Sequence, residues 1–140
     1  MLLGSLALAD AALFTGAAAY ITFVEQPARL KLDDSALLTE WRPAYARGTA
    51  MQAPLAALGL VFGLAAWWFE GGAFWLVGAL LMGANWPWTM LVVGPVNKRL
   101  VAIEQPGAGS RALIRQWGRR HAVRTALGAA AVITSLVASR

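Results

Sequence analysis

The chain has 140 residues, of which 59% are hydrophobic and only 14% are charged, with a mean hydropathy of +0.56. Soluble domains are about 45–50% apolar and about 25% charged, so this composition excludes an ordinary soluble domain and predicts a single membrane domain, residues 1–140. The absence of cysteine excludes disulfides and thiolate chemistry, and the net charge of +5 reflects membrane topology rather than nucleic-acid binding, because the cations flank apolar runs.

Four apolar runs predict four membrane-spanning helices, since a spanning helix needs about 20 residues. The first is expected to be retained rather than cleaved as a secretory signal, because it has no Lys or Arg before it and carries Asp10. We therefore predict an all-α fold, an integral membrane four-helix bundle with cytoplasmic helical extensions. The expected spans are about 2–24, 49–69, 73–94 and 118–138.

The positive charges predict the orientation of the chain. Eleven of the twelve Lys and Arg residues fall between Arg29 and Arg47 or between Lys98 and Arg124, whereas the 70–72 connection has none. The positive-inside rule then places both long connections in the cytoplasm and both termini outside it, in a multi-pass protein of the inner (plasma) membrane. Arg140 is the one exception to this pattern.

The long connections carry helical signals of their own. Residues 35–42 predict a short amphipathic helix that begins after a Ser35 cap and lies along the membrane surface. Residues 95–103 are expected to extend the third helix. The turn-rich stretch 105–110 predicts a break, after which Ser110 caps a final helix that runs from about 111 to 138.

Polar and aromatic side chains collect at the cytoplasmic end of the predicted bundle. Trp117, His121 and Arg124 follow an i, i+4, i+7 spacing, so they share one face of the last helix. The other residues expected at this depth are Glu25, Trp41, Tyr45, Gln52 and Asn97. This convergence indicates a site at that end of the bundle.

The same residues can instead have purely structural roles. Glu25 and Arg124 can form an ion pair, His121 can bond a helix-end carbonyl, and the aromatic rings can be interfacial anchors. Asp10 is either a functional group inside a span or a side chain that reaches outward or pairs with Asn85. A metal site would have only His121 and Glu25 as ligands, whereas catalytic metal sites use three or more, and no motif supports a haem.

Four segments resemble the anthrone-oxygenase-like family of small four-helix membrane proteins, and the resemblance covers nearly the whole chain. They are VEQPAR (24–29), EWRPAYARGTAMQAPLA (40–56), GPVNKRL (94–100) and WGRRHAVRTALG (117–128). The resemblance implies oxidation of an anthrone to an anthraquinone by O2 without an added cofactor. The chain departs from the pattern at Gln26, where the family often has His, so a two-histidine mechanism or metal site does not carry over.

Matched to that reaction, His121 is the expected base, because imidazole titrates near neutral pH, and Glu25 is the second choice. Arg124 and Asn97 would stabilise the enolate. The residues expected to bind the flat substrate are Trp117, Trp41, Tyr45 and Gln52.

The expected cofactor is none, with a metal or haem left open. The expected partners are membrane lipids, a small aromatic or quinol-like substrate, O2 and further copies of the chain, but no nucleic acid. The alternative function is a non-catalytic membrane module that binds a lipid, a quinone or a partner helix.

Overall fold

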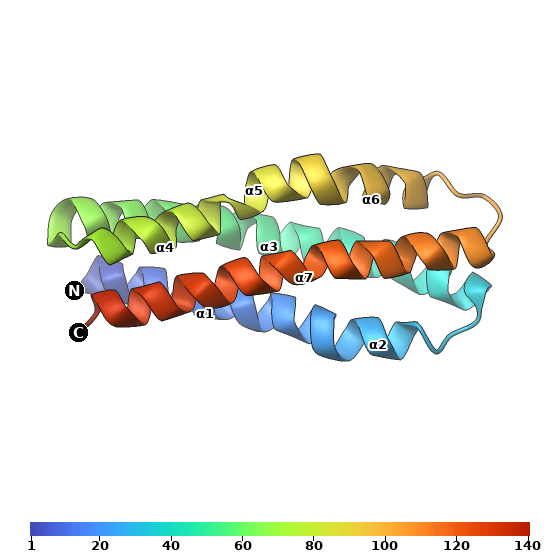
Figure 1. The fold of residues 1–140 in the computed structure, drawn as a ribbon, viewed down its shortest axis with the longest axis horizontal. Coiled ribbons are helices and arrows are strands. Elements are labelled where there is room, and N and C mark those ends of the chain that lie inside the picture. Colours follow the sequence, from blue (N-terminus) through green and yellow to red (C-terminus); the bar gives the residue numbers. More distant parts are fainter.

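The computed structural model describes residues 1–140 and contains helices but no strands, which confirms the all-α prediction. Four long rods run back and forth, with both termini and the 70–72 turn at one end and the two longer connections at the other (Figure 1). The second and fourth rods are the single helices α3 (Asp34–Glu70) and α7 (Ala108–Ala138). The first rod is α1 (Leu2–Tyr20), η1 (Ile21–Glu25) and α2 (Gln26–Arg29), and the third is α4 (Ala73–Gly83), α5 (Asn85–Trp88), η2 (Thr89–Val93) and α6 (Gly94–Val101).

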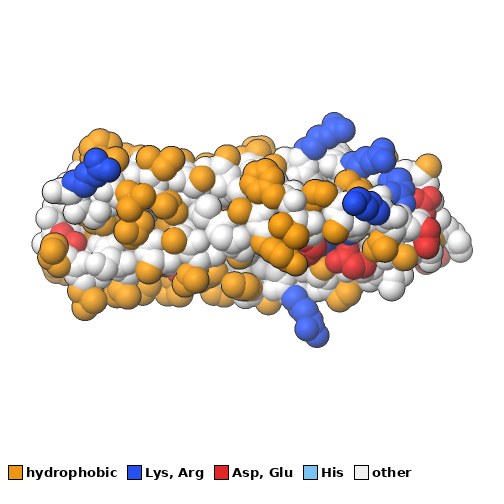
Figure 2. Space-filling view, turned by 90° about the horizontal axis from the view of Figure 1, so that it is seen from below, with side chains coloured by type: hydrophobic (Ala, Val, Ile, Leu, Met, Phe, Trp, Pro, Cys, Tyr) orange, Lys and Arg blue, Asp and Glu red, His pale blue; other side chains and the backbone are white.

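All four rods are long and apolar enough to cross a membrane, as expected of a multi-pass membrane protein. Their lengths are 28, 37, 29 and 31 residues. At about 1.5 Å per residue even the shortest measures about 42 Å, whereas the hydrocarbon core is about 30 Å thick. Each rod therefore extends beyond the hydrocarbon core, which confirms the predicted extensions. Figure 2 shows Lys and Arg side chains gathered mainly toward one end, with hydrophobic side chains over the rest of that face.

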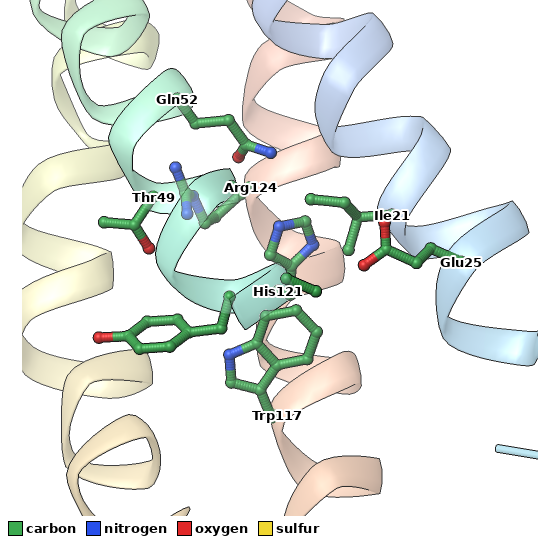
Figure 3. A pocket seen from close by; sticks show the side chains of 10 residues that line it. Ile21, Glu25, Thr49, Gln52, Trp117, His121 and Arg124 are labelled. Atoms are coloured by element: carbon green, nitrogen blue, oxygen red, sulfur yellow. The ribbon is translucent and has the colours of Figure 1, made fainter. Parts of the chain in front are cut away.

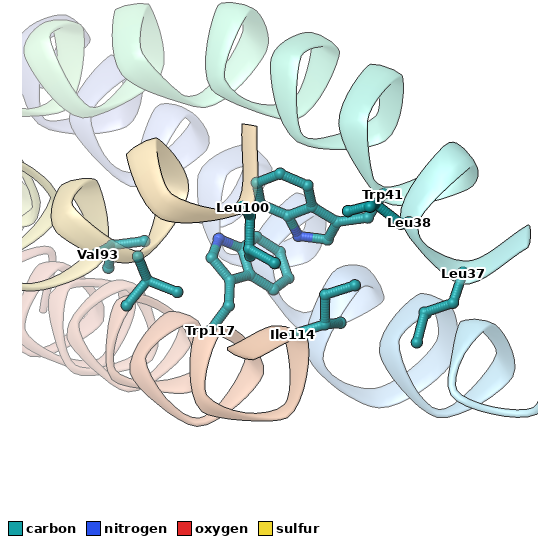
Figure 4. Packing of buried hydrophobic residues seen from close by; sticks show 8 residues of the cluster. Leu37, Leu38, Trp41, Val93, Leu100, Ile114 and Trp117 are labelled. Atoms are coloured by element: carbon teal, nitrogen blue, oxygen red, sulfur yellow. The ribbon is translucent and has the colours of Figure 1, made fainter. Parts of the chain in front are cut away.

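The rods form a square bundle, in which α1 and α4 each pack against both α3 and α7. Three hydrophobic clusters follow one another inside it. Two of them consist mainly of small residues with Phe14, Met82 and Trp75 as the large members. The third, which we call the aromatic end cluster, lies toward the end of the bundle with the two longer connections. It contains Leu37, Leu38, Trp41, Val93, Val96, Leu100, Ile114 and Trp117, whose packing Figure 4 shows.

Two details of the predicted connections are wrong. Residues 35–42 do not form a separate surface helix, because α3 runs without a break from Asp34 through Pro43 and Pro54 to Glu70. Its cap is Asp33, whose carboxylate accepts the backbone N–H of Ala36 at 2.9 Å. The apolar side of this segment faces the protein interior, since Leu37, Leu38 and Trp41 belong to the aromatic end cluster.

The last helix also begins earlier than expected. It starts at Ala108, so Ser110 lies in its first turn, where its hydroxyl accepts the Gly107 N–H at 2.9 Å and donates to the Gly107 carbonyl at 2.8 Å. The predicted extension of the third helix past residue 95 is confirmed, because α6 ends at Val101. The predicted break exists but lies three residues earlier than expected, at residues 102–107, because residues 108–110 already belong to α7.

Two wide π-helical turns interrupt the first and third rods shortly before a proline. The turn η1 ends two residues before Pro27, and η2 ends two residues before Pro95. A proline within a helix lacks the N–H donor, and its ring clashes with the carbonyl four residues earlier, so a locally wider turn relieves the conflict. Each turn rotates the helix that follows, and residues of both turns border the cavities described below.

Candidate functional site

A small hollow inside the bundle is walled by the first, second and fourth rods (Figure 3). Its free volume is about 10 Å³, roughly the space of one water molecule. The residues that line it are Ile21, Glu25, Ala44, Tyr45, Gly48, Thr49, Gln52, Trp117, His121 and Arg124. Six of the eight predicted site residues therefore lie together: Glu25, Tyr45, Gln52, Trp117, His121 and Arg124.

His121 is held on two sides. Its ring stacks on Trp117, with centroids 5.0 Å apart, and its side chain is only 2% exposed. Its Nδ1 atom lies 3.3 Å from the Thr22 hydroxyl, which in turn lies 2.8 Å from the Thr125 hydroxyl. The partner of His121 is thus a hydroxyl from η1 and not a helix-end carbonyl, and Nε2 has no hydrogen bond within the protein.

Arg124 is a buried cation without a counter-ion. It is 6% exposed, its guanidinium lies over the Phe14 ring at 5.5 Å, and its Nε atom has no acceptor. The ion pair between Glu25 and Arg124 that the sequence allowed is wrong, because Glu25 pairs with Arg29. Figure 3 shows the side chains of Arg124, Gln52 and His121 converging on the hollow.

Arg29 forms ion pairs with two carboxylates near the hollow. Besides Glu25, it contacts Glu40 at 3.1 Å, and its guanidinium lies 5.5 Å from the Trp117 ring. The Arg29 side chain is only 2% exposed. Glu25 therefore reaches the wall of the hollow as the partner of a buried arginine.

Two predicted site residues lie outside the hollow. Trp41 is fully buried in the aromatic end cluster, stacked on Tyr45 at 4.8 Å and edge-on to Trp117 at 5.8 Å. Asn97 is buried on α6, and its Oδ1 atom has no partner. Neither side chain lines the hollow. Trp41 and Trp117 are buried inside the protein, so they do not act as anchors at the membrane interface.

Gln26, which stands where the family pattern often has His, joins two helices. Its side-chain amide donates to the Ile114 carbonyl at 2.9 Å. It packs so closely on Gly118 that a Cβ atom at that glycine would lie 2.5 Å from the Gln26 amide nitrogen. Gln26 does not line the hollow.

A second, larger cavity adjoins the hollow and shares Thr49 and Arg124 with it. Its volume is about 210 Å³, and its lining residues are Thr49, Ala53, Ala56, Asn85, Trp86, Thr89, Met90 and Arg124. The sequence did not point to this cavity, nor to the role of Thr22. Thr125 could have been found, because it lies four residues after His121 on the same helix.

Asp10 does not reach outward and does not pair with Asn85. It is 6% exposed, its Oδ2 atom has no partner, and it packs where a side chain at Gly59 would otherwise stand. The Asn85 amide instead donates to the Leu81 and Met82 carbonyls of its own rod. Asp10 lines neither cavity, and no three His, Cys, Asp or Glu side chains lie close enough together to hold a metal ion.

Comparison with known protein families identifies the family of the chain. A family model described as Anthrone oxygenase matches residues 41–134, which is about two thirds of the chain. The matched segment includes every residue of α3 and α7 that lines the hollow, but not Glu25 or Thr22. No curated protein and no solved structure matches the chain. Because the match spans more than half of the sequence, the chain belongs to the anthrone oxygenase family.

Proposed function

We propose that this protein is a membrane-embedded oxygenase that uses O2, without an added cofactor, to oxidise a small aromatic substrate of the anthrone or quinol type. The observation that supports it most directly is the pairing of a base with a cation: His121 has a free Nε2 atom in the same hollow as the unpaired Arg124. A base and a positive charge side by side suit a reaction that removes a proton and leaves an oxyanion.

We assign the hydrogens of the hydroxyl chain so that Nδ1–H donates to Thr22 and Thr22 donates to Thr125. In this tautomer the lone pair of His121 lies on Nε2. Stacking on Trp117 holds the ring plane. Thr22 is thus a positioning residue, and Nε2 is the atom that accepts the proton.

The reaction balances with O2 as the only oxidant. His121 takes a proton from the substrate methylene that is conjugated with the ketone, and the negative charge moves onto the ketone oxygen, which Arg124 stabilises. The enolate carbon passes one electron to O2, and the resulting radical pair closes a carbon–oxygen bond to give a peroxide.

His121 returns its proton to the outer oxygen of the peroxide. It then accepts the second methylene proton while the new carbonyl forms and the O–O bond breaks, which releases hydroxide. The departing hydroxide takes the proton held by His121 and leaves as water. The sum is one anthrone and one O2 to one quinone and one water.

The test measures O2 uptake and quinone absorbance together, with anthrone as substrate and protein-free micelles as the background. We expect one O2 per quinone. His121→Asn should lower kcat by roughly 10²–10⁴-fold, the usual contribution of a general base, in protein that circular dichroism shows to be folded at the assay temperature. Gln116→Asn, on the same helix but outside the hollow, is the matched control and should retain parent turnover.

Full turnover by His121→Asn would remove His121 from the role of base. If the parent protein itself does not accelerate quinone formation above the micelle background, the oxygenase proposal falls. The polar cluster then serves the alternative function, a membrane module that binds a lipid, a quinone or a partner helix.

A further inference from the structure

The larger cavity lies where the third rod bends away from the second. The helix α4 ends at Gly83, and α5 and η2 continue on a displaced line (Figure 1). Pro87 explains the break, because its ring conflicts with the carbonyl of residue 83, four positions earlier. The facing wall of α3 has only the small side chains of Thr49, Ala53 and Ala56, so the gap stays unfilled.

The rim of this cavity is apolar and exposed. Trp86 is 46% exposed and Met90 is 68% exposed, and both belong to a rod that is long and apolar enough to span the membrane. The surface around them is therefore in contact with lipid. An apolar molecule dissolved in the bilayer can reach the cavity without crossing water.

The inner end of the cavity is polar and incompletely bonded. Arg124 has no ion-pair partner, and the side-chain oxygens of Asn85 and Thr89 are buried without hydrogen bonds. An unpaired cation in a membrane interior is unfavourable, so an anionic or strongly accepting oxygen is the group that this end would bind. A ligand with an apolar ring body and one such oxygen matches both ends.

The adjoining hollow is too small to hold aromatic rings, since its volume is about 10 Å³ against about 210 Å³ for the cavity. Thr49 and Arg124 form the wall that the two spaces share. A ligand oxygen bound by Arg124 therefore lies at the boundary with the hollow of His121, while the rings occupy the larger space.

We infer that the cavity walled by Ala53, Ala56, Trp86 and Met90 is a ring-binding subsite that a flat, uncharged aromatic ketone or phenol enters from the bilayer, with its oxygen directed to Arg124. This rests on the proposed function for the identity of the ligand as substrate. The binding itself requires no turnover, so it can be tested separately.

The probe is 1,8-dihydroxyanthraquinone, a compound of the product class that has no methylene to oxidise. Its binding to the full chain in lipid nanodiscs is followed by quenching of tryptophan fluorescence. Ala53→Leu fills the cavity and should raise Kd by roughly tenfold or more. Ala57→Leu, one turn along α3, partly buried and outside the cavity, is the matched control and should stay within about threefold of the parent.

A second variant keeps the test decisive if Ala53→Leu does not fold. Met90 is exposed, so Met90→Trp should fold normally while it narrows the rim, and it should slow association of the probe. Arg124→Gln should also raise Kd, because it removes the charge at the inner end. The subsite is overturned if the parent does not bind the probe, or if Ala53→Leu and Met90→Trp bind it as the parent does.

The two proposals fail in different ways. If Ala53→Leu loses binding while His121→Asn still turns over anthrone, the subsite stands and the role of His121 as base falls. If His121→Asn is inactive while Ala53→Leu and Met90→Trp both bind the probe as the parent does, the oxygenase stands and the subsite falls.

Discussion

Replacing Trp41 by alanine tests whether this side chain is packing rather than a wall of the site. Trp41 is 0% exposed, stacks on Tyr45 with an interplanar angle of 3° and meets Trp117 edge-on. Truncating a buried tryptophan usually costs about 3–5 kcal/mol, and each aromatic contact contributes about 0.5–1.5 kcal/mol beyond its area. Since domain stabilities are about 5–15 kcal/mol, Trp41→Ala should remove a large part of the free energy of unfolding.

The measurement is reversible unfolding in mixed micelles, followed by circular dichroism. Trp68 is the matched control, because it is 73% exposed and lies at the opposite end of the bundle, so Trp68→Ala should change stability by about 0.5 kcal/mol or less. A double-mutant cycle with Tyr45→Ala should give a coupling of about 0.5–1.5 kcal/mol. Equal losses for Trp41→Ala and Trp68→Ala, or a coupling of zero, would refute the packing role.

Two further predictions concern the groups around the hollow. Arg29 is buried between Glu25 and Glu40, so either single change, Glu25→Gln or Glu40→Gln, leaves it one carboxylate partner. The double change leaves the buried guanidinium without a carboxylate and should lower the free energy of unfolding by about 3–5 kcal/mol. The double variant should therefore lose more stability in the micelle assay than the two singles added together, and simple additivity would contradict this. Thr22→Val strands His121 Nδ1 and Thr125 Oγ1, so we expect a loss of about 1–3 kcal/mol and a lower kcat at unchanged KM, with recovery in Thr22→Ser. A Thr22→Ser variant as impaired as Thr22→Val would show that the hydroxyl is not what positions the ring.

Much of the candidate site could be predicted from the sequence, because helical periodicity alone places residues on a face. The spacing of Trp117, His121 and Arg124 brings all three to the hollow. The position of these residues along the bundle axis was predictable as well. The ends of the apolar runs place Glu25, Tyr45 and Gln52 at the same depth in the membrane. Periodicity does not give the rotation of one helix against another, however, so it could not tell that Trp41 and Asn97 face other neighbours.

By itself, the sequence determined the number of spans, the gathering of positive charge at one end and the face of the last helix that carries the histidine. These properties sum over many residues, so local irregularities do not change them. Only the tertiary structure decided that Arg29 is shared between Glu25 and Glu40, that Thr22 holds His121, and that a cavity opens beside Arg124. Each of these depends on a π-helical turn or a bend near a proline, where a rotation within one turn of helix selects which side chains meet.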